Sequence, residues 1–331
     1  MMLSQNTKQT YPRLLADIGG TNARFALEIA ERQFVAVRVL ACADFPRLAD
    51  AMQSYLGSPE IKQELGKLGT RIAHAAVAIA NPVDGDQVHM TNHEWSFSIA
   101  GMRQQLDFST LLVLNDFTAL AMALPYLDAS QRLQIGGGVE QPGRTIGLIG
   151  AGTGLGVSGI VPAGTSWAPL ASEGGHASFA PANNEEVQIL LNLWQQYAHV
   201  SAERLLSGKG LELICTAISG KKLNAAEITH RALDGSCSAC LRTVEHFCGI
   251  LGSMAGNVAL TLGAKGGMYI GGGIVPRLGP LFAASAFRQR FEAKGRLSGF
   301  LAQIPTYLIT EEYPAFIGVS AMLADHLDKH K

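Results

Sequence analysis

The chain has 331 residues, of which 47% are hydrophobic and 16% charged, and its formal net charge is −1. This composition excludes an intrinsically disordered chain, which needs low hydrophobicity and high net charge, and the length predicts two domains. The chain contains 37 glycines in 331 residues, a larger fraction than the usual ~7%. They follow no three-residue period, which excludes collagen.

The first half of the chain predicts strands and helices in alternation. Residues 1–13 are polar and lack the apolar core of a secretory signal, so a cytoplasmic location is expected. Short apolar runs predict strands at 13–17, 23–28, 33–39, 71–80 and 111–114. Apolar residues at helical spacing predict helices at 45–56 and 116–124.

The composition changes from Pro125 onward, and three glycines at 136–138 mark a loop. Strands are predicted at 145–149, 155–161, 166–170, 268–270 and 305–309. Helices dominate residues 184–264, and a closing helix is predicted at 315–327. This order of strands and helices predicts an α/β protein with two halves.

Two similar glycine-threonine turns stand at equivalent places in the two halves. Asp17-Ile-Gly-Gly-Thr-Asn22 follows the first strand of one half, and Gly150-Ala-Gly-Thr-Gly-Leu-Gly156 follows the first strand of the other. The repetition indicates a duplicated fold, with a ligand held between the two turns in an interdomain cleft.

Two uncharged stretches, 145–172 and 247–264, resemble membrane spans in length. Glycines and Pro162 divide the first into short strands. The second contains Gly252-x-x-x-Gly256, a pattern that also occurs in membrane helix dimers, but its polar residues favour a buried, close-packed helix of a soluble core. No membrane partner is therefore expected.

The five cysteines are scattered and form no disulfide framework. They are Cys42, Cys215, Cys237, Cys240 and Cys248. Cys237-Ser-Ala-Cys240, with His246 nearby, leaves a zinc site as the minor alternative to free thiols packed on helices. No stripe of lysine and arginine is present, so no nucleic-acid partner is expected.

The first turn suits phosphate, because glycine lets backbone N–H groups approach an anion without a Cβ in the way. Thr21 adds a hydroxyl donor, and Asp17 can hold a phosphate-bound Mg²⁺ through water. The alternative is a plain hairpin with glycine at positive φ.

The second turn, 150–156, has too many glycines to be expected in a simple hairpin. Residues Gly154 to Gly159 formally match the dinucleotide-binding pattern G-x-G-x-x-G, but the pattern runs on into strand residues rather than a helix, which argues against it. A third cluster, Gly271 to Gly273, would let an adenine ring lie against backbone, or it is a strand-to-helix turn with Pro276 opening the helix.

Asn115 and Asp116 end a buried strand, and ligands bind at the carboxyl ends of strands in α/β sheets. A carboxylate there can accept a proton from an attacking hydroxyl. The alternative is that Asp116 only caps the next helix.

Further polar residues suit hydrogen bonds to vicinal hydroxyls. Glu173-Gly-Gly-His176 presents a carboxylate and an imidazole from one tight turn. Glu203 either joins them or only stabilises a helix N-terminus. Asn81, His93 and Trp95 belong either to the site or to its rim.

Taken in this order, these segments resemble the bacterial-type glucokinase family, within the actin-like, sugar-kinase and heat-shock ATPase fold. The resemblance runs from Leu15 to about Ala321. It rests on the segments 16–24, 90–95, 115–119, 150–156, 173–176, 200–204 and 271–276.

The resemblance implies an α/β, two-domain actin-like ATPase (ribonuclease H-like) fold with an interdomain active-site cleft. It implies a small domain at 1–125 plus 314–331 and a large domain at 126–313. Asp116 would be the catalytic base, and the sugar hydroxyls would be held by Asn115, Glu173, His176 and Glu203. The ATP-binding residues would be Ala16, Asp17, Ile18, Gly19, Gly20, Thr21, Asn22, Gly152, Thr153, Gly154, Gly271, Gly272 and Gly273.

The activity implied is ATP-dependent phosphorylation of the glucose 6-hydroxyl to glucose 6-phosphate, feeding glycolysis in the cytoplasm. Mg²⁺ would arrive with ATP, without a direct protein ligand, and the protein would be a homodimer. Phe179-Ala-Pro181 stands where the related repressor/open-reading-frame/kinase sugar kinases carry a cysteine-rich zinc motif. The rival hypotheses are a non-enzymatic sugar sensor of the same fold and a nicotinamide oxidoreductase.

Overall fold

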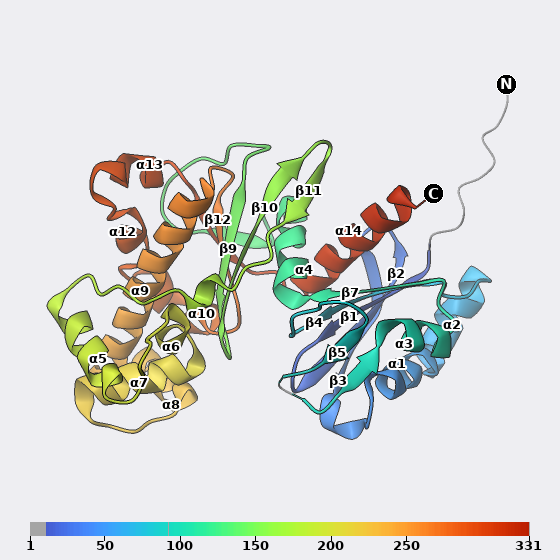
Figure 1. Cartoon of the computed structure of the whole chain (residues 1–331), viewed down its shortest axis with the longest axis horizontal. Helices are drawn as coiled ribbons and strands as arrows, with labels where there is room; N and C mark the ends of the chain where they lie inside the picture. Colours follow the sequence, from blue (N-terminus) through green and yellow to red (C-terminus); the bar gives the residue numbers. More distant parts are fainter. Residues whose placement is uncertain (1–10, 92, 331) are drawn as a thin grey trace. The chain divides into compact units, whose positions relative to one another are not determined.

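The computed structural model describes residues 11–91 and 93–330 of the chain. The polar segment 1–13, which we do not expect to be a secretory signal, lies mostly outside the described residues. The described chain divides into two compact units, the first running through Tyr126 and resuming at Glu312, and the second spanning Leu127–Glu311 (Figure 1).

The first unit is built on a five-stranded sheet in the order β3-β2-β1-β4-β7. Its strands are β1 (Arg13–Ile18), β2 (Asn22–Ala30), β3 (Gln33–Ala41), β4 (His74–Ile79) and β7 (Thr110–Asn115). A separate two-stranded sheet pairs β5 (Gln87–His89) with β6 (Ser96–Ser98). The helices are α1 (Leu48–Leu56), α2 (Pro59–Leu68), α3 (Ile99–Gln105), α4 (Asp116–Ala123) and α14 (Pro314–Lys329).

Strand alternation divides the core of this unit between the two faces of the sheet. Leu15 of β1 packs in a cluster with α14, while its neighbours Leu14 and Ala16 belong to a second cluster that includes residues of α1. Because helices cover both faces, the inner strand β4 is almost entirely apolar and buried, whereas the edge strand β3 is largely exposed.

The second unit contains a six-stranded sheet in the order β11-β10-β9-β12-β13-β8. Its strands are β8 (Arg132–Gln134), β9 (Ile146–Ala151), β10 (Leu155–Ala163), β11 (Ser166–Pro169), β12 (Met268–Gly271) and β13 (Thr306–Ile309). Its helices are α5 (Asn184–Trp194), α6 (Ala202–Leu205), α7 (Gly208–Ser219), α8 (Ala225–Leu233), α9 (Ser238–Leu262), α10 (Val275–Leu278), α11 (Pro280–Ala283), α12 (Phe287–Glu292) and α13 (Ser298–Ala302).

The two sheets repeat one connectivity, which confirms the predicted duplication. In the first sheet β1 pairs antiparallel with β2 and parallel with β4, and β4 pairs parallel with β7. In the second, β9 pairs antiparallel with β10 and parallel with β12, and β12 pairs parallel with β13. The turns β1–β2 and β9–β10 therefore occupy equivalent positions, and only β8 has no counterpart.

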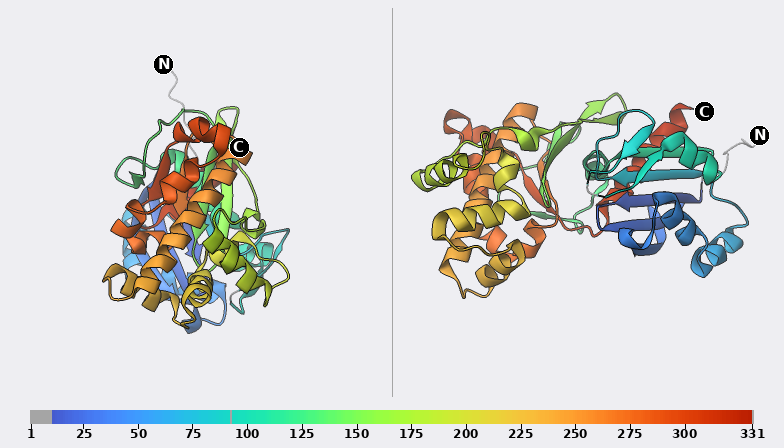
Figure 2. Two further views of the ribbon diagram at one scale, coloured as in Figure 1. Left: turned by 90° about the vertical axis from the view of Figure 1, so that its left-hand side faces the viewer. Right: turned by 60° about the horizontal axis from the view of Figure 1, so that its bottom comes forward.

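The uncharged stretch 247–264 lies mostly in α9, a 25-residue helix whose buried residues include Phe247 and Leu251. Helices α9 and α12 lie side by side (Figures 1 and 2), and a Cβ added at Gly252 would stand 2.1 Å from the carbonyl oxygen of Phe287. The prediction of a buried, close-packed helix is confirmed. No helix in the described part of the chain is long and apolar enough to cross a membrane.

Element boundaries differ from prediction where the chain is extended before a helix or strand. The helix predicted from Phe45 begins at Leu48, since Arg47 is its extended N-cap, and the strand predicted from Arg71 begins at His74. All five cysteines are free and buried, and the described residues hold no cluster of three or more His, Cys, Asp or Glu that could bind a metal.

Candidate active site

Three parallel strands of the first unit end at one edge of its sheet. Ile18 of β1 lies opposite Ile79 of β4, which lies opposite Asn115 of β7. The turn after β1, the residues after β4 and the Asn115–Asp116 pair therefore meet at the carboxyl edge, where α/β proteins bind ligands.

Asn115, and not Asp116, caps helix α4. The Asn115 Oδ1 atom accepts hydrogen bonds from the amides of Phe117 and Thr118, at 3.0 and 3.1 Å. The alternative that Asp116 merely caps the helix is therefore wrong. Asp116 uses only Oδ1, which accepts from Asn115 Nδ2 (3.0 Å) and the Phe117 amide (2.8 Å), so Oδ2 has no hydrogen-bond partner among the described residues.

The pKa of Asp116 is raised to about 6, chiefly because burial penalises the charged carboxylate. The negative charge of Asp17 raises it further, while hydrogen bonds from Phe117 and Asn115 oppose the shift. A carboxylate with a pKa near 6 remains mostly ionised at neutral pH yet accepts a proton more readily than an ordinary aspartate.

Asp17 is held by Arg24, which lies opposite it on β2, with 3.1 Å between Arg24 Nη1 and Asp17 Oδ2. Burial raises the pKa of Asp17, and the Arg24 charge works against that rise. This pairing was not predicted, although opposite charges facing across a short hairpin could have indicated it.

The first turn is a hairpin in which some of the backbone amides already donate hydrogen bonds within the protein. Gly19 N donates to Asn22 O (3.0 Å), whereas the amides of Gly20 and Thr21 donate to no described residue. The side chains of Ala16 and Ile18 are fully buried in the core. Of the predicted ATP-binding positions here, Gly20 and Thr21 thus offer uncommitted backbone donors.

The second turn is also a hairpin, against expectation. Ala151 pairs with Leu155, which leaves Gly152, Thr153 and Gly154 as the loop. Packing explains one glycine of this turn, because a Cβ added at Gly154 would lie 2.5 Å from Oε2 of Glu203, whereas a Cβ at Gly152 would meet nothing within 4 Å. The formal dinucleotide pattern beginning at Gly154 continues along β10, as expected for a pattern that does not bind dinucleotide.

Glu173, His176 and Glu203 form one polar cluster. The Ala202 amide donates to Ala177 O (2.8 Å), which fastens helix α6 to the segment after His176. His176 Nε2 consequently lies 3.9 Å from both Glu203 Oε1 and Glu173 Oε2. The Glu173 and His176 side chains are 78% and 60% exposed, and Glu203 is 33% exposed, so all three remain available to a ligand.

The third glycine cluster follows β12 and has a packing role in addition to any binding role. Gly272 has φ +82°, and a Cβ there would stand 2.3 Å from Ala151 O, so only glycine fits. Gly273 has open space around its Cα. Pro276 lies in the first turn of the four-residue helix α10, as predicted for a strand-to-helix turn.

Asn81 lies beside Asn115, and Trp95 is buried in the core with the His93 ring packed on it. The carbonyl oxygen of Asn81 accepts from Asn115 Nδ2 (3.4 Å), and its Oδ1 accepts from the Thr91 amide (3.1 Å). Trp95 is buried and donates from Nε1 to a backbone carbonyl, and the His93 ring packs on it, 4.6 Å between centroids.

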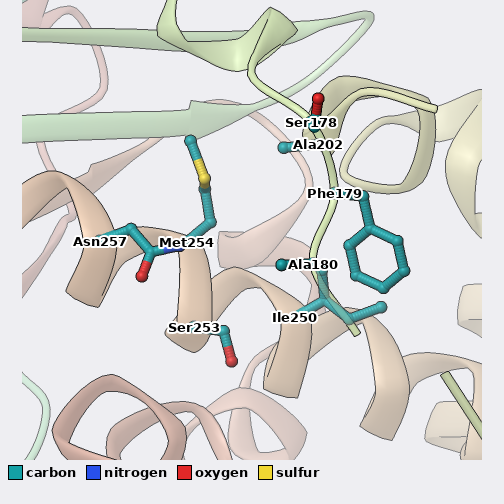
Figure 3. A pocket seen from close by; sticks show the side chains of 8 residues that line it. All are labelled: Ser178, Phe179, Ala180, Ala202, Ile250, Ser253, Met254 and Asn257. Atoms are coloured by element: carbon teal, nitrogen blue, oxygen red, sulfur yellow. The ribbon is translucent and has the colours of Figure 1, made fainter. Parts of the chain in front are cut away.

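A small pocket adjoins the cluster of Glu173, His176 and Glu203. One wall carries Ser178 and Ala202, the near neighbours of His176 and Glu203, and the other is the α9 face with Met254 and Asn257 (Figure 3). None of its lining residues is charged. The pocket offers no candidate acid or base.

A family model described as Glucokinase matches residues 14–326. The chain belongs to the glucokinase family. The glucokinase of Chromobacterium violaceum is 52% identical to this chain, in an alignment that covers 98% of this chain and 93% of that protein. The bifunctional protein glk of Paraburkholderia xenovorans is 55% identical over 96% of this chain but only 49% of that protein, so the chain spans about half its length.

A solved glucokinase from an Antarctic psychrotroph has a TM-score of 0.85 and 38% identity, covering 95% of this glucokinase-family chain and 99% of that one. The α/β, two-domain actin-like ATPase fold expected from the sequence is confirmed.

Proposed function

We propose that this chain is an ATP:glucose 6-phosphotransferase, which converts glucose to glucose 6-phosphate and so feeds glycolysis. The observation that carries the proposal is Asp116, a buried carboxylate at the end of β7 with a pKa near 6 and an uncommitted Oδ2. Membership of the glucokinase family supports the choice of substrates.

Asp116 Oδ2 accepts the proton of the glucose 6-hydroxyl as that oxygen attacks the γ-phosphorus of ATP. The bond between the γ-phosphorus and the β–γ bridging oxygen breaks, and ADP leaves with those electrons. The amides of Gly20 and Thr21 donate to phosphate oxygens and stabilise the negative charge of the transition state. Gly152, Thr153 and Gly154 also contact the phosphates, although the Gly152 amide itself already donates to Gly154 O (2.8 Å). Gly271 to Gly273 line the adenosine.

The sugar hydroxyls are bound by Glu173, His176 and Glu203, and by Asn115 when its amide exchanges the 3.4 Å bond to Asn81 O for a sugar oxygen. Carboxylates and an imidazole together accept and donate hydrogen bonds, which suits adjacent hydroxyls. Mg²⁺, bound to the ATP phosphates, supplies positive charge, and Asp17 would hold it through water because its Oδ1 has no described partner.

We also propose a cytoplasmic homodimer, because ATP is an intracellular donor and helix α5 presents an apolar stripe. Val187, Leu191 and Trp194 follow helical spacing and are 38–55% exposed. Residues 187–202 contain no Asp, Glu, Lys or Arg, so two copies can meet here without like charges facing each other. Light scattering should give twice 35.1 kDa, and Leu191→Glu should give the monomer.

A coupled assay of ADP release with glucose, mannose and fructose tests the proposed activity. ADP release that requires sugar, with glucose 6-phosphate as product, is expected. Sugar binding without ADP release would identify a sensor, and NAD binding without ATP binding would identify an oxidoreductase; either result contradicts the proposal.

A further inference from the structure

The Glu203 side chain is anchored on the β9–β10 hairpin. Its Oε2 atom accepts a hydrogen bond from the amide of Leu155, 3.0 Å away, and its Oε1 faces His176 Nε2. Leu155 is the first residue of β10, directly after the turn that contains Gly154. One oxygen of this carboxylate thus belongs to the turn and the other to the polar cluster.

Gly154 leaves the space in which the carboxylate sits. A Cβ at this position would stand 2.5 Å from Glu203 Oε2 and 3.2 Å from Cδ, and the first distance is too short, so the carboxylate would have to move away. The φ of Gly154 is outside the left-handed region, so the backbone itself does not require glycine. The nearby carboxylate is therefore the physical reason for glycine here.

The hairpin is also hydrogen-bonded to helix α7, which follows Glu203 in the chain. The amide of Gly208, at the start of α7, donates to Gly152 O (2.9 Å), and Gly152 N donates across the turn to Gly154 O (2.8 Å). Helix α6, which carries Glu203, directly precedes α7. A displacement of the turn is thus transmitted to Glu203 through both its side-chain bond and its own chain segment.

We propose that Gly154 and the Leu155 amide are positioning residues for Glu203, and that through them the phosphate-binding turn couples nucleotide binding to sugar binding. The inference rests on the proposed function, in which the turn holds ATP phosphates and Glu203 holds glucose. A nucleotide that orders the turn also orders the carboxylate, and the two ligands must then change each other's affinity by the same factor.

Gly154→Ala tests the positioning role, with Gly137→Ala as control, because Gly137 is an exposed glycine of the same unit at which a Cβ meets nothing within 4 Å. Glucose affinity is measured by calorimetry without nucleotide. We expect Gly154→Ala to weaken it roughly tenfold, about the loss of one hydrogen bond to a charged group, and Gly137→Ala to change it less than about twofold. Equal effects of the two variants, or no effect of Gly154→Ala, would overturn the inference.

A double-mutant cycle shows whether Gly154 acts through Glu203. In a Glu203→Gln background, adding Gly154→Ala should weaken glucose binding by less than about twofold further, whereas additive losses would contradict the inference. Should Gly154→Ala fail to fold, hydrogen exchange at the Leu155 amide tests the bond to Glu203 instead. We expect the exchange rate of this amide to increase in Glu203→Ala. An unchanged exchange rate would contradict the inference.

The coupling is measured as the ratio of glucose dissociation constants with and without a non-hydrolysable ATP analogue. We expect the analogue to tighten glucose binding in the unmodified chain and the ratio to approach one in Gly154→Ala. A ratio of one in the unmodified chain would contradict the proposed coupling. If the unmodified chain binds no glucose at all, the proposed function itself fails, which is a different outcome.

Discussion

Asp116 shows how a single side chain acquires its chemistry from its neighbours. Asn115 takes over the cap of α4, which leaves Asp116 Oδ2 without a described partner, and burial with the nearby Asp17 raises its pKa to about 6. An aspartate at an exposed cap would titrate near 4 and would be a weaker proton acceptor.

Replacing Asp116 by Asn removes the proton acceptor while keeping the shape and most hydrogen bonds of the side chain. We expect turnover to fall by roughly 10³-fold or more, with glucose affinity nearly unchanged. Steady-state kinetics and calorimetry on the same preparation measure both quantities. A variant with near-normal kcat would remove Asp116 from the role of base.

The pH dependence should report the raised pKa of Asp116. A base must be unprotonated to act, so activity is present above its pKa and is lost as the pH falls through about 6. The acid limb of kcat/KM should therefore bend near pH 6, and an acid limb near pH 4 would show that another group, or no group, acts as base. Asp116→Asn supplies the residual rate against which the limb is read.

Glu173→Gln keeps the size of the side chain but removes its charge. A hydrogen bond from a sugar hydroxyl to a carboxylate contributes about 1.5–3 kcal/mol, so the glucose KM should rise tenfold or more while kcat changes little. Measuring both constants at saturating ATP separates a binding role from a catalytic one. An unchanged KM would exclude Glu173 from sugar binding.

Several glycines permit close packing between secondary-structure elements. Gly252 lets α9 approach α12, Gly272 lets the β12 turn pass β9, and Gly154 makes room for Glu203. In the first turn, by contrast, the Gly20 amide donates to no described residue. The high glycine content therefore has several separate structural causes.

Gly252→Ala should destabilise the chain, because its Cβ would meet the Phe287 carbonyl at 2.1 Å and force α12 away from α9. We expect a loss of about 1–3 kcal/mol in the free energy of unfolding, the usual cost of overpacking. Gly66→Ala, on the exposed face of α2 with nothing within 4 Å, should instead add about 0.5–1 kcal/mol. Denaturant titration of both variants measures the contrast, and equal effects would contradict it.

At the scale of the whole molecule, one topology occurs twice and carries different chemistry each time. The first unit places Asp116 and the Gly20–Thr21 amides at its sheet edge, and the second carries Glu173, His176 and Glu203 around its hairpin.

This division of roles predicts slow ATP hydrolysis in the absence of sugar. In the proposed reaction Glu173, His176 and Glu203 orient the sugar hydroxyl toward the phosphate, and a water molecule is too small to be held by all three. We expect phosphate release from ATP to be at least about 10²-fold slower than transfer to glucose, the usual cost of a misplaced nucleophile. Comparable rates with and without sugar would show that the second-unit cluster does not orient the acceptor.

Features that depend on local spacing could be predicted from the amino-acid sequence. Apolar periodicity and strand-ending turns predicted most strands and helices, the two related halves and the buried helix α9, since these follow from patterns within a few residues of one another. The ordered series of motifs was enough to indicate the glucokinase family. The start of α1 was misplaced because an extended Arg47 precedes it.

How residues distant in the chain act on one another became evident from the folded structure. It showed that the turn at 152–154 is a hairpin whose Gly154 accommodates Glu203, that Asn115 rather than Asp116 caps α4, and that burial raises the pKa of Asp116. These properties depend on which groups are brought within a few ångströms and how much water is excluded around them. Neither quantity is encoded in the spacing of residues along the chain.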